Sequence, residues 1–217
     1  MTDNFDRYRE FIKKTGGDLP DNNNKGTLDK YYVIELMRRG KDNPDMPAAN
    51  YHFKNYYIYS WKDYNIYKEE IKTICKLFRL RAYASVNFKL MHQVALDTMA
   101  ESARRIAAHD FKKFYSIFES CSGKFHIRAN SLWVIDIDDE DLEKWPNVIE
   151  DIKSIIKNDC KSKYDEPIVY KMPTKSGFHL ITHPFDKMKF NKKFEEMYHE
   201  SAPVIKDNHL TLLFEDL

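Results

Sequence analysis

The segment Trp133-Val-Ile-Asp-Ile-Asp138 is an apolar stretch with aspartates at two alternate positions. Alternation of this kind predicts a β-strand, in which residues i and i+2 share one face with Cα atoms roughly 6 to 7 Å apart. Asp136 and Asp138 should therefore project together, with two isoleucines packed behind them. Carboxylates this close repel unless a cation lies between them, so the pattern points to a divalent metal ion. The alternative is a strand end that leads into the solvated acidic run 139–141.

A second polar motif lies in Lys175-Ser-Gly-Phe-His-Leu-Ile181, a predicted tight turn between two apolar strands. Small residues in a turn expose backbone N–H groups and a hydroxyl to an anion, and a nearby lysine or imidazole adds further donors to phosphate oxygens. Lys175, Ser176, Gly177 and His179 are therefore candidate nucleotide ligands. The alternative is ordinary hairpin chemistry with a packed or surface histidine.

The order of predicted elements indicates an α+β fold with a mixed or antiparallel sheet, because helices and strands alternate without Gly-rich βαβ turns. We expect one compact domain over 1–217, with a helical N-terminal segment at 1–50 that includes a helix from Leu28 to Met37 capped by Thr27. Strands are predicted at 52–60, 80–88, 132–138, 167–172, 178–182 and 210–214, and further helices at 3–14, 64–77, 89–108, 111–118, 146–158 and 189–199.

Composition narrows the function classes. The chain of 217 residues has 35 basic and 34 acidic side chains, so any attraction to nucleic acid must come from local patches. No apolar run approaches the roughly 20 residues of a membrane span, and the first residues lack a signal-peptide layout, so we expect a cytoplasmic protein without membrane contact. Cys75, Cys121 and Cys160 are isolated, which predicts buried or incidental thiols and no zinc module.

The two motifs, in this order, resemble the archaeo-eukaryotic primase superfamily, which includes the primase-polymerases, and look like its small phage or mobile-element versions. The first motif of that family is an apolar strand ending in Asp-x-Asp, and the second is a Ser-Gly-x-His segment. Its third motif, an apolar residue followed by an acidic one, is matched approximately by Ile205-Lys-Asp207, with Glu215 and Asp216 as substitutes. The resemblance covers about 132–214.

This resemblance implies an RRM-like primase catalytic core within 51–217 and metal-dependent nucleotidyl transfer in DNA replication, by a primase or a primer-extending polymerase. It implies that Asp136, Asp138 and Asp207 hold two Mg²⁺ or Mn²⁺ ions, while the second motif binds the phosphates of the incoming nucleotide. The implied partners are a single-stranded DNA or RNA template and nucleoside triphosphates. Any zinc module or helicase, or other replication proteins, would come from other chains.

Basic and polar residues upstream are candidates for nucleic-acid binding. Arg79, Arg81, Asn87 and Lys89 occupy odd positions on or near one predicted strand, so an unbroken strand would place them on one face. The alternative is a solvated sheet face. Two readings of function also compete with the primase: a metal-dependent nuclease or end-processing enzyme that uses the same carboxylates, and a non-catalytic nucleic-acid-binding replication accessory protein on a primase-like fold.

Overall fold

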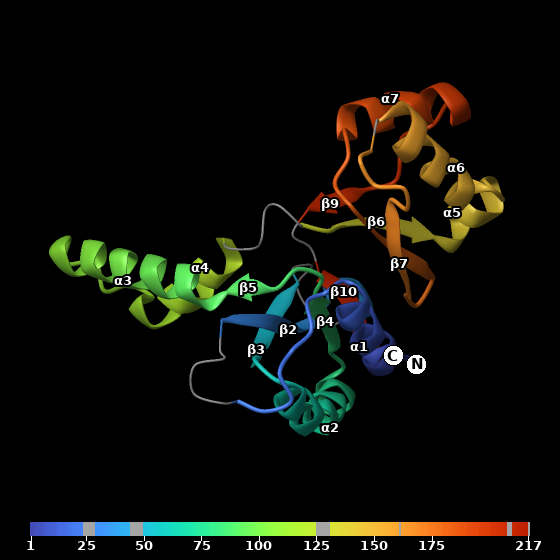
Figure 1. Cartoon of the computed structure of the whole chain (residues 1–217). Coiled ribbons are helices and arrows are strands. Elements are labelled where there is room, and N and C mark those ends of the chain that lie inside the picture. The colour runs from blue at the N-terminus through green and yellow to red at the C-terminus, as the bar shows by residue number, and fades with distance from the viewer. Residues whose placement is uncertain (24–28, 44–49, 125–130, 161, 208–209, 217) are drawn as a thin grey trace.

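A computed structural model describes the chain except residues 24–28, 44–49, 125–130, 161, 208–209 and 217, and the side chains of Lys41 and Asp207. Its architecture is α+β with antiparallel sheets (Figure 1). One sheet runs in the order β1-β10-β4-β2-β3, with β5 paired to β2, and the other runs in the order β7-β8-β6-β9. Within the described residues, no helix is long and apolar enough to cross a membrane.

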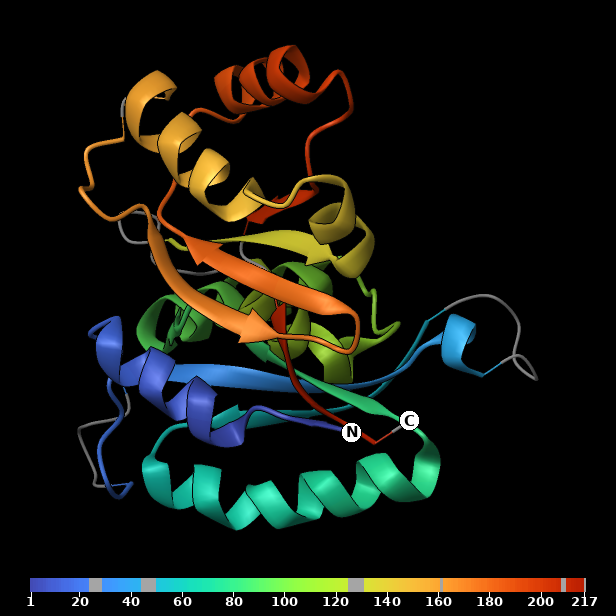
Figure 2. The same ribbon diagram turned by 90° about the vertical axis from the view of Figure 1, so that its right-hand side faces the viewer.

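The first sheet combines both ends of the chain with its first half. Its strands are β1 (Thr2–Asp3), β2 (Lys30–Arg38), β3 (Tyr51–Ile58), β4 (Arg81–Ser85), β5 (Lys89–Leu90) and β10 (Leu210–Glu215), and a 3₁₀ turn, Gly40–Asp42, follows β2. Helices α1 (Phe5–Lys14) and α2 (Trp61–Phe78) pack against this sheet (Figure 2). The stacked rings of Tyr8 and Tyr64 join the two helices.

The second sheet consists of β6 (Trp133–Asp138), β7 (Ile168–Pro173), β8 (Gly177–Thr182) and β9 (Ile205–Asp207). Ile135 and Ile137 face a core formed with α5 (Asp139–Lys144), α6 (Val148–Ser154), the π-helical turn Ile155–Asp159 and α7 (Lys187–Tyr198). Val134 on the opposite face joins the core of the first sheet together with Met172 and Ile181. The two sheets therefore share a core, and the polar half of β6 lies at its margin.

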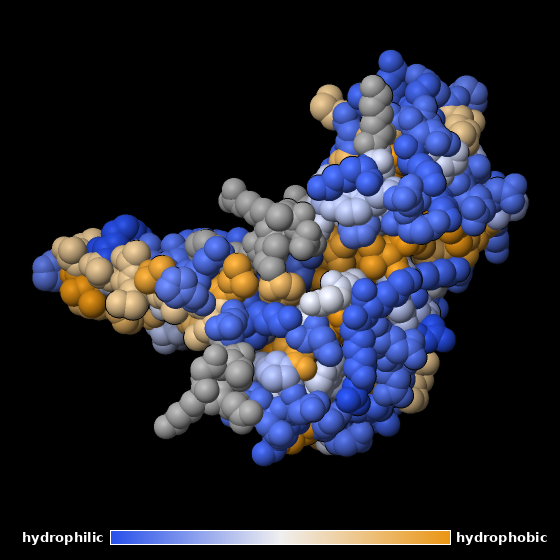
Figure 3. Space-filling view, in the orientation of Figure 1, coloured by the Kyte–Doolittle hydropathy of each residue, from blue (hydrophilic) through white to orange (hydrophobic). Residues whose placement is uncertain are grey.

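Helices α3 (Met91–Ala107) and α4 (Ile117–Lys124), joined through the 3₁₀ turn Phe114–Ser116, form an arm that projects from the first sheet (Figure 1). Val94 and Cys121 anchor the base of the arm in a small core with Tyr31. Apolar surface remains exposed along the arm (Figure 3), and the exposed large hydrophobic side chains of α3 include those of Leu96, Met99 and Ile106. The arm is thus attached at its base, away from the core that the two sheets share.

Most of the predicted elements are confirmed to within a few residues, but the helix expected from Leu28 to Met37 is wrong. Residues Lys30–Arg38 form strand β2, and Thr27, the expected cap, lies outside the described residues. Strand β2 pairs with β3 and with β4, and its buried side chains enter different cores on its two faces. In a strand that is buried on both faces, apolar and polar residues do not alternate. Its apolar residues can then recur at the spacing expected of a helix.

Shorter elements differ from the expectation as well. Strands β1, β5 and β9 and helix α5 were not predicted, and the helix expected at 111–118 is the turn Phe114–Ser116 followed by α4. Each of these strands has two or three residues, too few to show a periodic pattern. Helix α5 begins directly at the acidic run 139–141, where carboxylates are favourable at the helix N-terminus.

Candidate functional site

Strand pairing brings the two polar motifs together. In the antiparallel ladder of β6 and β8, Asp136 lies opposite His179 and Asp138 lies opposite Gly177. Opposite residues of a ladder point to the same face, so the carboxylate of Asp136 and the imidazole are neighbours. The Nε2 atom of His179 lies 3.3 Å from Oδ1 of Asp136.

Asp136, Asp138 and His179 line a cavity of about 570 Å³ to which both sheets contribute. Its first wall comes from the second sheet and the β7–β8 turn: Asp136, Asp138, Lys175, Ser176, His179 and Lys206. Its other wall includes Arg39, Asp42, Arg81 and Tyr83. The volume lies in the range usual for sites that bind small ligands. Because the lining alternates carboxylates with cationic groups, the cavity suits a ligand that has anionic groups and carries a metal ion.

Asp136 is a strongly perturbed acid of this cavity. Its pKa lies well below the usual value for a carboxyl group, because His179 donates a hydrogen bond to it and the charges of His179 and Lys206 add to the effect, against the cost of partial burial. The Nζ atom of Lys206, from β9, lies 3.3 Å from Oδ2 of Asp136. The carboxylate therefore stays ionised and is held from two sides.

His179 is buried and is held at both ring nitrogens. Its Nδ1 atom lies 3.0 Å from Oγ1 of Thr211, a buried residue of β10 in the other sheet. In the neutral ring with its proton on Nε2, Nδ1 accepts a hydrogen bond from the Thr211 hydroxyl, whereas in the charged ring Nδ1 donates to that oxygen. Thr211 was not identified from the sequence, since nothing near it in the chain distinguishes it from other strand threonines.

The turn before β8 depends on Gly177. Its backbone φ of +126° is one that residues other than glycine rarely adopt. A Cβ atom there would lie 2.1 Å from the carbonyl oxygen of Ile137. The carbonyl of Ser176 accepts a hydrogen bond from the N–H of Asp139, at 3.1 Å, so the turn is tied to the start of α5. Gly177 thus holds the turn against β6, and Lys175 and Ser176 line the cavity from it.

Asp138 serves the local fold as well as the cavity. It precedes the first turn of α5, and its backbone N–H donates a hydrogen bond to Oδ2 of Asp141, at 3.0 Å. Its own side chain is exposed and lines the cavity. Asp138 can therefore end strand β6 before an acidic helix and also present a carboxylate to the cavity.

The third carboxylate is the part of the site that the described residues do not supply. Asp207 lies opposite Trp133 in the β6–β9 ladder, and its side chain is outside the described part of the chain. The two substitutes are already engaged in ion pairs: buried Glu215 with Arg81, and Asp216 with Lys76. No group of three or more His, Cys, Asp or Glu side chains that could hold a metal ion occurs among the described residues.

The expected nucleic-acid-binding face is not formed by its four residues. Arg79 ends α2 in a left-handed conformation, and buried Asn87 exchanges hydrogen bonds with the backbone of Leu132. Lys89 is buried in β5 beside another cavity, where burial lowers its pKa to about 8. Arg81 lines the cavity of Asp136, but its guanidinium is paired with Asp42 and Glu215. The expectation that residues at odd positions share one face requires an unbroken strand. Strand β4 ends at Ser85, so the four residues do not share one strand.

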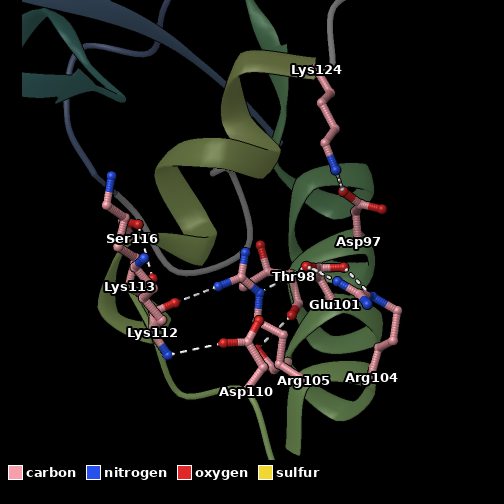
Figure 4. Close-up of polar contacts among 11 residues, drawn as sticks. Asp97, Thr98, Glu101, Arg104, Arg105, Asp110, Lys112, Lys113, Ser116 and Lys124 are labelled. Carbon is pink, nitrogen blue, oxygen red and sulfur yellow. Dashed lines mark hydrogen bonds and ion pairs between the residues drawn. The ribbon is translucent and has the colours of Figure 1, made fainter. Parts of the chain in front are cut away.

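The side chains of Arg104, Arg105 and Lys124 contact acidic or backbone groups of the α3–α4 arm itself (Figure 4). Arg104 and Arg105 both pair with Glu101, and Arg105 also donates a hydrogen bond to the carbonyl of Lys112. Because both arginines share Glu101, they attract phosphates less than two unpaired arginines would.

Comparison of the chain with protein-family models, with curated proteins and with solved structures found no match.

Proposed function

We propose that the protein is a metal-dependent nucleotidyltransferase that acts on nucleic acid, as a primase or primer-extending polymerase of the type its motifs resemble. The observation that carries this proposal is the pairing of Asp136 with His179 in the β6–β8 ladder. It joins an acidic motif and a phosphate-binding type of motif on one face of one sheet, beside a cavity of about 570 Å³. These are the two halves that a metal-bound nucleotide requires.

The acidic half fits a Mg²⁺ or Mn²⁺ ion. Mg²⁺ is commonly held by one or two carboxylates together with substrate phosphates and water, and Asp136 and Asp138 offer two carboxylates on one strand. Because the pKa of Asp136 is lowered, its carboxylate is ionised at neutral pH. When bound, such an ion would favour ionisation of the attacking hydroxyl of the primer and stabilise the charge of the leaving pyrophosphate.

The other half binds and orients the nucleotide through the chain's own residues. Lys175 and Ser176 present an ammonium group and a hydroxyl at the cavity wall, and both are donors to phosphate oxygens. His179, whose two ring nitrogens contact Asp136 and Thr211, orients the Asp136 carboxylate beside these donors. A single-stranded template would approach from outside this cavity, and initiation of primers would draw on helicase or other replication proteins in trans.

Synthesis on a single-stranded template tests the proposal. We expect the purified chain with Mn²⁺ and nucleoside triphosphates to make or extend a primer, and the double substitution Asp136→Asn with Asp138→Asn to abolish synthesis while circular dichroism stays unchanged. The matched control removes two exposed carboxylates outside the cavity, Asp159→Asn with Asp165→Asn, and should retain full activity. Synthesis that survives in the first double variant would refute the proposal.

Two other outcomes would assign the site differently. Metal-dependent cleavage of an oligonucleotide without added nucleotides would indicate a nuclease or end-processing enzyme that uses the same carboxylates. Template binding without synthesis, and without Mn²⁺ bound at Asp136 and Asp138, would indicate a non-catalytic accessory protein. Cleavage and template binding can both be measured with the same labelled oligonucleotide.

A further inference from the structure

Lys206 occupies an unusual place beside the candidate metal-binding carboxylates. It lies opposite Val134 in the β6–β9 ladder and lines the same cavity as Asp136. Its Nζ atom is 3.3 Å from Oδ2 of Asp136, while His179 Nε2 is 3.3 Å from Oδ1. Each oxygen of this carboxylate thus has a nitrogen donor from a different neighbouring strand.

A two-metal site needs a carboxylate that is shared between the ions. In such sites the ions lie about 3.5 to 4 Å apart, and the bridging group commonly offers one oxygen to each. Here one oxygen of Asp136 faces the ammonium group of Lys206, which would repel a divalent ion placed at that oxygen. The described lining adds no third ligand near the pair that would offset this repulsion.

We infer that the Lys206 ammonium group takes the place of one of the two metal ions, so that the nucleotide complex of this protein holds a single divalent cation. This inference rests on the proposed function, since it concerns the same site. Lys206 supplies one positive charge beside Asp136, and the remaining ion is held by Asp138, the partly exposed carboxylate of Asp136 and the nucleotide phosphates. The ammonium group is part of the chain, whereas occupancy by a second ion would depend on the ion's concentration.

Counting bound Mn²⁺ tests the inference without any measurement of activity. Electron paramagnetic resonance reports free Mn²⁺, so Mn²⁺ titration of the full chain with a saturating non-hydrolysable nucleoside triphosphate, after subtraction of the Mn²⁺ that the same nucleotide binds without protein, gives the number of ions bound per complex. We expect one ion for the unaltered chain and two for Lys206→Glu, which removes the ammonium group and adds a ligand. Lys206→Met, which only removes the charge, should bind Mn²⁺ at least about tenfold more tightly.

The control is Lys192→Met, which removes an exposed lysine of α7 and should leave both number and affinity unchanged. Two ions in the unaltered chain would overturn the inference and leave the proposed function intact. No bound ion in any variant would overturn both. Unchanged affinity in Lys206→Met would also overturn the inference, and this variant serves if Lys206→Glu fails to fold.

Discussion

Replacement of Gly177 by alanine tests whether the turn before β8 requires a positive φ and a close approach to the backbone of β6. A methyl group at this position would lie 2.1 Å from the carbonyl oxygen of Ile137 and 2.9 Å from the Cα atom of Asp138, and the φ of +126° is itself unfavourable for alanine. Backbone strain of this kind costs about 1 to 3 kcal/mol, and relief of the clash must move backbone of β6 because no flexible side chain is involved. We expect Gly177→Ala to lower the free energy of unfolding by about 3 kcal/mol.

Urea unfolding followed by circular dichroism measures this change. With a slope of about 2 kcal/mol per molar urea, the midpoint should fall by about 1.5 M. Gly123→Ala is the matched control: a Cβ atom there would meet no described atom within 4 Å outside the backbone of its own helix, and the residue lies in helix α4. Since alanine favours helix, this control should leave the free energy of unfolding unchanged or raise it by up to about 1 kcal/mol. Equal midpoints for Gly177→Ala and the unaltered chain would refute the description of this turn.

Two further predictions concern the groups around His179. Thr211→Val removes the partner of Nδ1 and should change the tautomer populations of His179 in ¹⁵N NMR spectra and reduce nucleotide affinity, whereas Thr211→Ser should retain both; an unchanged tautomer in the valine variant would contradict the positioning role. Asp136→Asn should lower the free energy of unfolding at pH 7 by about 2 kcal/mol, because His179 and Lys206 lose an ionised partner. Since the folded-state pKa of Asp136 is depressed, its contribution is complete above about pH 5 and is lost as the pH falls through that depressed value, so the difference between variant and unaltered chain should shrink in acid; a difference independent of pH between 7 and 2 would contradict this.

The predictable features are those that short stretches of sequence encode. The alternation in Trp133–Asp138 indicated a strand with two carboxylates on one face, and that face is observed. The glycine between Ser176 and Phe178 indicated a tight turn, and its positive φ requires glycine. Both signals are local, because side-chain direction repeats along a strand and turn conformations depend on one or two residues.

The errors arose where burial depends on neighbours that are distant in the chain. Strand β2 was expected to be a helix because its residues are apolar on both faces, and only pairing with β3 and β4 explains that. Arg81 was expected on a nucleic-acid-binding face, yet in the fold it is paired with Asp42 and Glu215, which come from other parts of the chain. Charge in a sequence therefore shows which groups are present, and not which of them remain available.

The sequence by itself determined that Asp136 and Asp138 share a face, that Gly177 forms a turn, and that the chain forms an α+β fold. Only the tertiary structure decided what surrounds Asp136. Its neighbours are His179 on the adjacent strand β8, Lys206, which is 70 positions away in the chain, and Thr211, which contacts the imidazole of His179. The physical reason is that side-chain direction follows from local backbone geometry, whereas the partners of a side chain follow from which strands pair. Strand pairing is set by burial over the whole molecule.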